Sequence, residues 1–388
     1  MSAAKFMQIQ DNKATKIITN SYSSWIELNK KQFFSNISLI KKLIGPNKIL
    51  SLVAKANAYG HGILPIAKMA EENLDIDYIA VFKLSEATLL RKNRIKKNIL
   101  VLGLIDEDLK YAIENNIELT IFDLEIAKQL DLAAKKLNIK ANIHIKIDTG
   151  LSRLGFLYDD TESITQIAHL SNLNIKGIYS HFSESDIEND EFTKLQINRF
   201  LDLLENLKKE NINIPIKHIE NSSAVIRFQD KFKEFNFVRV GGAAYGIKKE
   251  FIAQNFKVNL KPIFSWKSKI ISIKEIPAES YISYARTFKA SQKLKIGIIP
   301  VGYCDGYDRR FSNNAFVLIN GKKANILGRV CMNMIIVDLS DIQANISDIV
   351  VLFGEHPELN PEAFSKKLNT ISYELLTRIN SQIPRIIV

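Results

Sequence analysis

Lys55 is the residue whose type and position most directly suggest chemistry. It ends the apolar, strand-like run ILSLVAK (residues 49–55) and precedes ANAYGHG, a loop of small residues that contains glycine. Burial at such a position lowers the pKa of an amine and favours imine formation with an aldehyde. The spacing alone also fits a lysine whose ammonium reaches water from the rim of a sheet, and it slightly favours that second interpretation.

Further cationic, imidazole and hydroxyl side chains follow later strand-like runs. HIKIDTGLSRLGF places Lys146 and Arg153 seven residues apart, although a lysine paired with a nearby acid is the alternative for Lys146. A histidine taken alone is more often a satisfied core residue than a ligand. The glycine N–H groups in FVRVGGAAYG could approach a phosphate without an intervening side chain. The candidates from these later runs are His181 in SHF; His218, Asn221 and Ser222 in HIENSSA; and Arg239, Gly241 and Gly242 in FVRVGGAAYG.

The runs that carry these residues alternate regularly with helix-like segments such as LEIAKQLDLAAKKLN. Eight strand-helix units favour an α/β fold with an eight-stranded parallel (β/α) barrel of the TIM type, with an open doubly wound sheet as the alternative. In a barrel, chemistry gathers where the strands end. The eight runs are residues 49–55, 77–83, 98–103, 118–123, 142–148, 175–182, 216–221 and 237–242.

From about Phe256 the pattern changes to long alternating segments, which predict a mostly antiparallel β domain. Asn320-Gly321 suits a two-residue hairpin turn, and Pro361 suits the first turn of a helix. The expected organisation is a polar leader at 1–17, a barrel at 18–256 and a β domain at 257–388.

The composition excludes several classes of protein. Of 388 residues, 46% are hydrophobic and 24% charged, and no stretch approaches the roughly 20 apolar residues of a membrane span. The net charge of +11 comes from dispersed lysines, without a nucleic-acid-binding motif. Two cysteines and the lack of an apolar signal segment predict a cytoplasmic location.

The ordered motifs resemble the alanine racemase family, from about Trp25 to Arg385. VAKANAYGHG resembles its cofactor-lysine motif, with Asn57 where aspartate is usual. YISYARTF resembles the segment of its catalytic tyrosine, here Tyr284. The resemblance implies that Lys55 carries pyridoxal 5'-phosphate and that Tyr284 enters the active site from the partner subunit of a homodimer.

The same resemblance implies roles for the other candidates. Arg153 would reach the phenolic oxygen of the cofactor and the substrate carboxylate, and Lys146, often carbamylated in the family, would orient Arg153. Arg239 would face the pyridine nitrogen and, as a permanent cation, keep it unprotonated. His181 would lie beside the cofactor ring, and His218 would hydrogen-bond the catalytic tyrosine. Tyr59, Ser222, Gly241 and Gly242 are implied phosphate contacts, and Asn221 a supporting residue.

The second domain carries three more family matches. VGYCDGY and GRVCMNM imply an entrance tyrosine at Tyr303 and a substrate-binding backbone N–H at Met332. ISYELLTRI makes Tyr373 a candidate for the cofactor site. Gly242 and Asn333 depart from the usual family residues, which puts the pocket shape and the charge-dependent contacts beside Met332 in doubt.

Taken together, the resemblance implies an isomerase that interconverts L-alanine and D-alanine. Inverting an alpha carbon requires proton removal on one face and return on the other, so Lys55 and Tyr284 would serve as two bases. A supply of D-alanine for peptidoglycan is the family-level expectation. The alternatives are a serine or broad-specificity amino-acid racemase and a non-catalytic barrel protein that binds pyridoxal phosphate.

Overall fold

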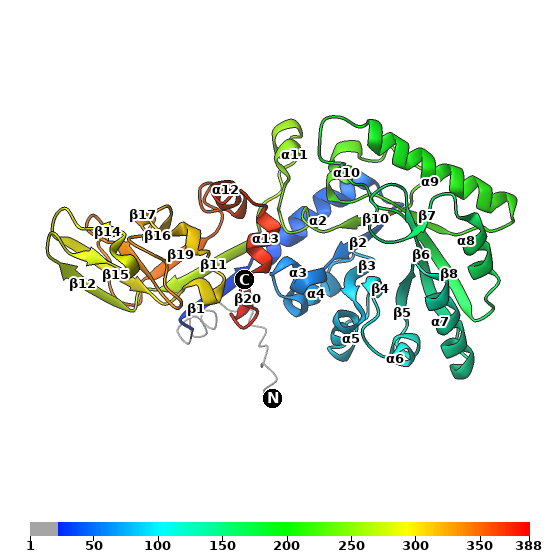
Figure 1. Cartoon of the computed structure of the whole chain (residues 1–388), viewed down its shortest axis with the longest axis horizontal. Helices are drawn as coiled ribbons and strands as arrows, with labels where there is room; N and C mark the ends of the chain where they lie inside the picture. The colour runs from blue at the N-terminus through cyan, green and yellow to red at the C-terminus, as the bar shows by residue number, and fades with distance from the viewer. Residues whose placement is uncertain (1–21) are drawn as a thin grey trace. The chain divides into compact units, whose positions relative to one another are not determined.

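The computed structural model describes residues 22–388, so the predicted leader at 1–17 lies outside the described residues. The chain forms two compact units (Figure 1). The barrel unit comprises Phe33–Ala58 and Ile66–Leu260. The β unit comprises Tyr59–Pro65 and Lys261–Val388, together with residues 22–32.

The barrel unit contains eight parallel strands in the order β10-β2-β3-β4-β5-β6-β8-β9. The two ends of this path meet where Arg239 N donates to Glu220 O at 3.0 Å, beside a parallel bridge between Asn221 and Arg239. The prediction of an eight-stranded barrel is therefore confirmed, and the open-sheet alternative is wrong. The strands are β2 (Ile49–Val53), β3 (Tyr78–Lys83), β4 (Asn98–Leu104), β5 (Ile117–Ile121), β6 (Ala141–Asp148), β8 (Leu173–Tyr179), β9 (Ile216–His218) and β10 (Phe237–Val240), and the short β7 (Phe156–Leu157) pairs with β6.

Amphipathic helices connect the strands. In α7 (Leu124–Leu137), Asp123 caps the first turn by accepting from Glu125 N and Ile126 N, and Asn138 ends the helix in a left-handed conformation. Its buried residues follow helical spacing and face the barrel. The other helices of this part of the chain are α2 (Lys30–Ile44), α3 (Lys55–Tyr59), α4 (Ile63–Glu72), α5 (Leu84–Lys92), α6 (Leu109–Glu114), α8 (Thr161–Ala168), α9 (Glu191–Lys209), α10 (Ser222–Phe228) and α11 (Glu250–Asn255).

The β unit is built on a six-stranded sheet in the order β17-β16-β19-β11-β1-β20, in which only the β1–β20 pair is parallel. A three-stranded sheet (β12-β15-β18) and the β13–β14 pair complete it. The bounds are β1 (Ser24–Leu28), β11 (Phe264–Lys269), β12 (Ser272–Ile276), β13 (Tyr281–Ile282), β14 (Phe288–Lys289), β15 (Leu294–Ile299), β16 (Phe316–Ile319), β17 (Lys322–Asn325), β18 (Ile335–Asp338), β19 (Ile349–Phe353) and β20 (Arg385–Ile387).

Two local predictions for this part of the chain are confirmed. Ile319 pairs with Lys322 across Asn320 and Gly321, whose φ angles of 50° and 76° suit a type I′ turn. Pro361 opens α12 (Pro361–Lys367), which is followed by α13 (Ser372–Thr377).

The division of the chain differs from the expected boundaries at its N-terminal side. β1 was expected in the barrel at 18–256, but Trp25 pairs with Lys267 of β11. The segment 59–65 also joins the β unit, because Arg385 donates to Gly60 O at 2.9 Å and the His61 ring lies 5.2 Å from that of Phe264. Both differences arise from pairing over more than 200 residues, which local patterns do not record.

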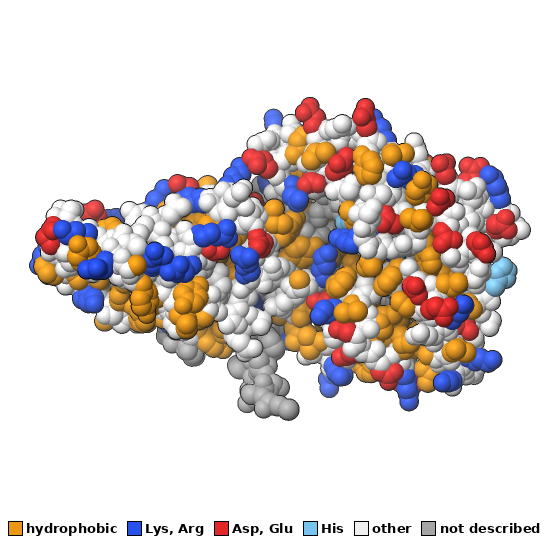
Figure 2. Space-filling view, in the orientation of Figure 1, with side chains coloured by type: hydrophobic (Ala, Val, Ile, Leu, Met, Phe, Trp, Pro, Cys, Tyr) orange, Lys and Arg blue, Asp and Glu red, His pale blue; other side chains and the backbone are white. Residues whose placement is uncertain are grey.

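The surface of the barrel unit intersperses acidic and basic side chains on the face seen in Figure 2. Within residues 22–388, no helix combines the length and the apolar character needed to cross a membrane.

Candidate active site

Lys55 lies two residues after the end of β2 and is partly buried at the end of the barrel strands. Burial lowers the pKa of its amine, the cationic Arg153 and Arg239 lower it further, and Glu86 opposes them. The amine is therefore more readily neutral, and more nucleophilic, than that of a solvated lysine.

The turn after Lys55 is left-handed, which is unusual for residues with side chains. Ala56, Asn57, Ala58 and Tyr59 have φ angles of 54°, 54°, 52° and 55°. Each left-handed residue costs roughly 1–2 kcal/mol, so surrounding bonds must hold the turn. Ala58 N donates to Ala54 O at 2.9 Å, and Ala56 N donates to Glu86 Oε1 at 2.8 Å. Strain of this kind concentrates at functional sites, and ANAY offers little local signal for it.

Arg239 on β10 is almost fully buried and donates to several acceptors inside the barrel. Nη1 donates to His218 Nδ1 at 2.5 Å, and Nη2 donates to Ser180 O at 2.7 Å and to His181 Nδ1 at 3.1 Å. Burial lowers the pKa of Arg239 to about 10, so the guanidinium is still charged near neutral pH. Because it can only donate, both histidines must accept through unprotonated Nδ1 atoms.

His218 does not have the environment that the resemblance implied. Its Nε2 lies 2.9 Å from His144 Nδ1, so Arg239 and His144 occupy both ring nitrogens of a fully buried residue. The implied hydrogen bond from His218 to a catalytic tyrosine is therefore wrong. His181 accepts from Arg239 through Nδ1, and among residues 22–388 this is the bond that its ring makes. Burial and then Arg239 hold the pKa of both histidines well below the usual range.

Lys146 lies near the end of β6, with Nζ 4.7 Å from the centre of the Tyr179 ring and donating to Ile147 O at 3.3 Å. Burial holds the pKa of Lys146 well below its usual range, and the charges of Arg239 and Arg153 add to this effect. The acid whose charge acts on Lys146 is Asp148, which opposes this lowering.

Arg153 ends a loop that Asp148 organises. The carboxylate of Asp148 accepts from Gly150 N at 2.8 Å, Ser152 N at 3.1 Å and Arg153 N at 3.0 Å. Burial alone would raise the pKa of Asp148, but these N–H donors outweigh it and lower that pKa. The Arg153 side chain itself is exposed.

Ser222 and the turn after β10 converge beside the start of α10. Ser222 Oγ accepts from Gly241 N at 3.0 Å and from Ala243 N at 3.3 Å. Asn221 caps α10 by accepting from Ser223 N and Ala224 N, both at 3.0 Å. Backbone N–H groups and a hydroxyl arranged in this way form a suitable cradle for an anion. Gly242 lies buried in the same turn, and its carbonyl oxygen accepts a hydrogen bond from Tyr245 N.

Two buried residues of the barrel interior were missed by the sequence reasoning. His144 lies two residues before Lys146 on β6, and Glu118 lies on β5. Since alternate strand residues share a face, the inward position of Lys146 in NIHIKID could have identified His144. Nothing in ELTIFD alone marks Glu118 as its partner.

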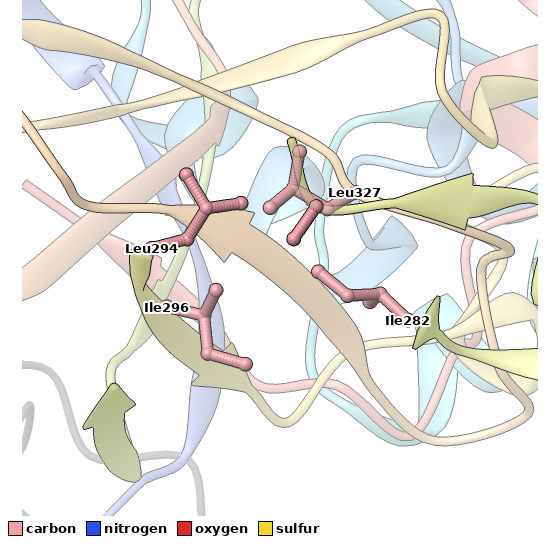
Figure 3. Packing of buried hydrophobic residues seen from close by; sticks show 5 residues of the cluster. Ile282, Leu294, Ile296 and Leu327 are labelled. Atoms are coloured by element: carbon pink, nitrogen blue, oxygen red, sulfur yellow. The ribbon is translucent and has the colours of Figure 1, made fainter. Parts of the chain in front are cut away.

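Tyr284 lies on the β unit, 69% exposed, in a short segment of strained backbone. Ser283, Ala285 and Arg286 all have positive φ angles. Ser283 Oγ donates to Arg329 O at 2.6 Å, which ties the segment to the loop that follows Gly328. Below it, a hydrophobic cluster anchors the neighbouring strands; Figure 3 shows its members Ile282, Leu294, Ile296 and Leu327.

Tyr303 and Met332 are brought together by backbone pairing. Tyr303 N donates to Cys331 O at 3.1 Å, and Cys304 N donates to Met332 O at 3.0 Å. A Cβ on Gly302 would lie 2.2 Å from Met332 O, so only glycine allows this approach. Asn333 Nδ2 donates to Cys304 Sγ at 3.0 Å, an interaction that needs no carboxylate charge.

Tyr59 and Tyr373 form a separate pair in the β unit, with ring centroids 5.4 Å apart in an edge-to-face arrangement. Burial raises the pKa of Tyr59 to about 12, so its hydroxyl stays protonated and can donate. The predicted residues therefore fall into a barrel set, the Tyr59–Tyr373 pair, and a set formed by Tyr284, Tyr303 and Met332.

Comparison with known families gives matches along nearly the whole chain. The family described as "Alanine racemase, N-terminal domain" matches residues 28–249, and "Alanine racemase, C-terminal domain" matches residues 263–387. An alanine racemase of Methanococcus maripaludis is 37% identical over 372 residues, which cover 94% of this chain and 99% of the relative. One of Clostridium novyi is 38% identical over 369 residues, covering 93% and 94%.

Solved structures give the same result. Alanine racemase of Clostridium difficile superposes with a TM-score of 0.89 at 34% identity, covering 95% of this chain and 96% of that one. The Bacillus anthracis alanine racemase, solved with bound L-Ala-P, has a TM-score of 0.85 at 30% identity, covering 94% and 95%.

The left-handed turn makes a prediction about stability. Replacing Ala56, whose methyl is exposed, by glycine should raise the free energy of unfolding by about 0.5 to 1 kcal/mol, because glycine adopts positive φ without strain. The control, Ala253→Gly in the ordinary helix α11, should lower it by about 1 kcal/mol. Urea denaturation measures both changes. A loss of stability of equal size in the two variants would show that the turn carries no strain.

Proposed function

We infer that this chain, which belongs to the alanine racemase family, is an isomerase that interconverts L-alanine and D-alanine. The observation that carries the chemistry is the combination of a Lys55 amine of lowered pKa with the buried cationic Arg239 on the neighbouring strand. An amine of this kind suits covalent attachment of an aldehyde, and a fixed cation suits a site that must restrain electron withdrawal.

Pyridoxal 5'-phosphate is the cofactor that these residues fit. Lys55 would hold its aldehyde carbon. Ser222 Oγ and the N–H groups of Gly241 and Ala243, already gathered at one point, would bind its phosphate, with further contacts from Gly242 and Tyr59. When bound, the cofactor withdraws electrons from the alpha carbon of an amino acid and so acidifies its proton.

Arg239 is the residue that would limit this effect. A guanidinium that remains charged can donate a hydrogen bond to a ring nitrogen, but it keeps its proton and does not transfer it. Placed against the pyridine nitrogen, Arg239 would keep that nitrogen unprotonated and weaken the electron withdrawal. Proton exchange at the alpha carbon would then be favoured over longer reaction sequences such as transamination.

Two bases would act on opposite faces of the alpha carbon. Lys55 would remove the proton from D-alanine and Tyr284 the proton from L-alanine, and each would return one in the reverse direction. Exposure of Tyr284 on the β unit makes it available to a second copy of the chain, so we propose a homodimer with shared active sites. His181, rather than His218, would donate to the tyrosine oxygen through Nε2.

The remaining residues would bind and select the substrate. Arg153 would pair with the alanine carboxylate and the phenolic oxygen of the cofactor, and the backbone N–H of Met332 would bind the same carboxylate. Tyr303 and Tyr373 would narrow the entrance and so favour a small side chain over that of serine or larger amino acids. We further propose a cytoplasmic enzyme that supplies D-alanine for peptidoglycan.

Lys146 is proposed to carry a carbamate. Its neutral amine can attack carbon dioxide, forming an N–C bond and releasing one proton, and the anion would be stabilised by Arg153 and Arg239, whose charges act on Lys146. The carbamate would then orient Arg153.

The central proposal is tested by loading the protein with pyridoxal phosphate. The visible absorbance band of lysine-bound cofactor should form, and a chiral assay should show conversion of L-alanine to D-alanine faster than that of L-serine. Lys55→Ala should lose both the band and the conversion, whereas Lys128→Ala on the exposed face of α7 should keep them. No band in the unaltered protein would refute the proposal.

The second base is tested with Tyr284→Phe, and with Tyr281→Phe as a matched exposed control. Loss of Tyr284 should slow racemisation by about 10²- to 10⁴-fold, while deuterium from the solvent still enters D-alanine through Lys55. Mixing Lys55→Ala with Tyr284→Phe protein under conditions that exchange subunits should restore activity, because one mixed site keeps both bases. Failure of the mixture to regain activity would contradict the shared site.

The carbamate is tested by ¹³C NMR of protein equilibrated with ¹³C-bicarbonate. One carbamate carbonyl resonance should appear in the unaltered chain and in Lys128→Gln, and it should be missing from Lys146→Gln. If the resonance survives in Lys146→Gln, the modification lies elsewhere.

A further inference from the structure

A continuous line of hydrogen bonds crosses the barrel interior below Arg239. Arg239 Nη1 donates to His218 Nδ1 at 2.5 Å, His218 Nε2 lies 2.9 Å from His144 Nδ1, and His144 Nε2 lies 2.8 Å from Glu118 Oε2. The Tyr78 hydroxyl donates to the other oxygen, Glu118 Oε1, at 3.2 Å. All five residues are at most 5% exposed, so water does not compete for these bonds.

The donor and acceptor roles along this line follow from its Arg239 end. A guanidinium only donates, so His218 Nδ1 must hold a lone pair and His218 must be neutral with its proton on Nε2. His218 then donates to His144 Nδ1, which leaves His144 neutral with its proton on Nε2. His144 in turn donates to Glu118, which as a carboxylate only accepts. Any other placement of the protons sets two donors against each other at one of the three bonds.

The two ends of the line carry opposite charges, a guanidinium at Arg239 and a carboxylate at Glu118. A buried cation without a nearby anion is costly. The buried acid whose charge acts on Arg239 is Glu220, but its Oε2 is bonded to Lys48 Nζ at 2.8 Å, and burial raises the pKa of Glu220 to about 7. Glu118 is thus the carboxylate connected to Arg239 by hydrogen bonds, through two imidazoles that each polarise the next.

We propose that Glu118 and His144 are positioning residues for the racemisation site: they lock His218 in its Nε2–H tautomer and thereby hold the Arg239 guanidinium in place. The proposal rests on the proposed function for its kinetic consequence, but not for the tautomers. The groups that face His218 are Arg239 on β10, His144 and Lys146 on β6, and the stacked ring of Tyr179 on β8, 4.6 Å away. A proton on His218 Nδ1 would face the N–H of Arg239 Nη1, 2.5 Å away, and two donors would oppose each other.

The first test is ¹⁵N NMR of the histidine rings in the full chain, with and without pyridoxal phosphate. His144 and His218 should both be Nε2–H tautomers, and His218 should stay neutral near pH 6.5, where a solvated histidine is half protonated, because burial and then Arg239 hold its pKa well below the usual range. Assignment uses the loss of signals in His144→Gln and His218→Gln. A proton on Nδ1 of His218 in the unaltered protein would overturn the proposal.

The second test removes the acceptor at the far end of the line. Glu118→Met leaves His144 Nε2–H without a partner, so the tautomers of both histidines should become mixed and kcat for alanine should fall roughly 10-fold, as is typical when the partner behind a site residue is lost. Glu118→Gln retains an amide oxygen for His144 and should restore the Nε2–H tautomers and most of kcat. Tyr78→Phe is the matched control, because it leaves intact the three hydrogen bonds that link Glu118, His144, His218 and Arg239.

The outcomes separate this proposal from the proposed function. Unchanged His218 tautomers in Glu118→Met, or a kcat equal to that of Tyr78→Phe, would overturn the positioning role while leaving racemisation intact. The expected tautomers in a protein that racemises no amino acid would instead refute the proposed function and leave the tautomer lock standing.

Discussion

The buried charge of Arg239 is the constraint on which the rest of the barrel interior depends. A guanidinium taken out of water must have an acceptor for its donors, and here they are two imidazole nitrogens and the carbonyl oxygens of Ser180 and Ile219. These acceptors come from the ends of β8 and β9 and the loops after them. The strand ends therefore cannot shift independently, and the residues that follow them are held in one arrangement.

The same charge contributes to the lowered pKa of two neighbouring lysines. Burial lowers the pKa of Lys55 and Lys146 most, and the charges of Arg239 and Arg153 lower both further. A lysine of lowered pKa is more often neutral, and its neutral amine can attack an electrophilic carbon. The single cation thus links the proposed attachment of the cofactor at Lys55 with the proposed carbamate on Lys146.

The two units divide the work. The barrel unit holds the groups that suit a cofactor, whereas the β unit holds two groups of exposed or half-exposed residues that suit substrate entry and a second base. In the β unit, backbone strain around Tyr284 and the close approach at Gly302 present side chains that regular strands would point elsewhere. In both units, strained backbone lowers stability at the segments that position candidate site residues.

Local sequence patterns by themselves determined the eight barrel strands, the Asn320-Gly321 hairpin and the helix that opens at Pro361, because these features depend on near neighbours in the chain. The ordered motifs likewise made Lys55, Ser222, Arg239 and Tyr284 candidates, since each lies near the end of a regular element or within a distinctive segment. Tertiary structure alone decided that β1 joins β11 and β20, that ANAY winds left-handed, and that His218 bonds Arg239 and His144 rather than a tyrosine. Each of these depends on atoms brought together from distant strands, where burial and the availability of acceptors, rather than local preference, select the arrangement.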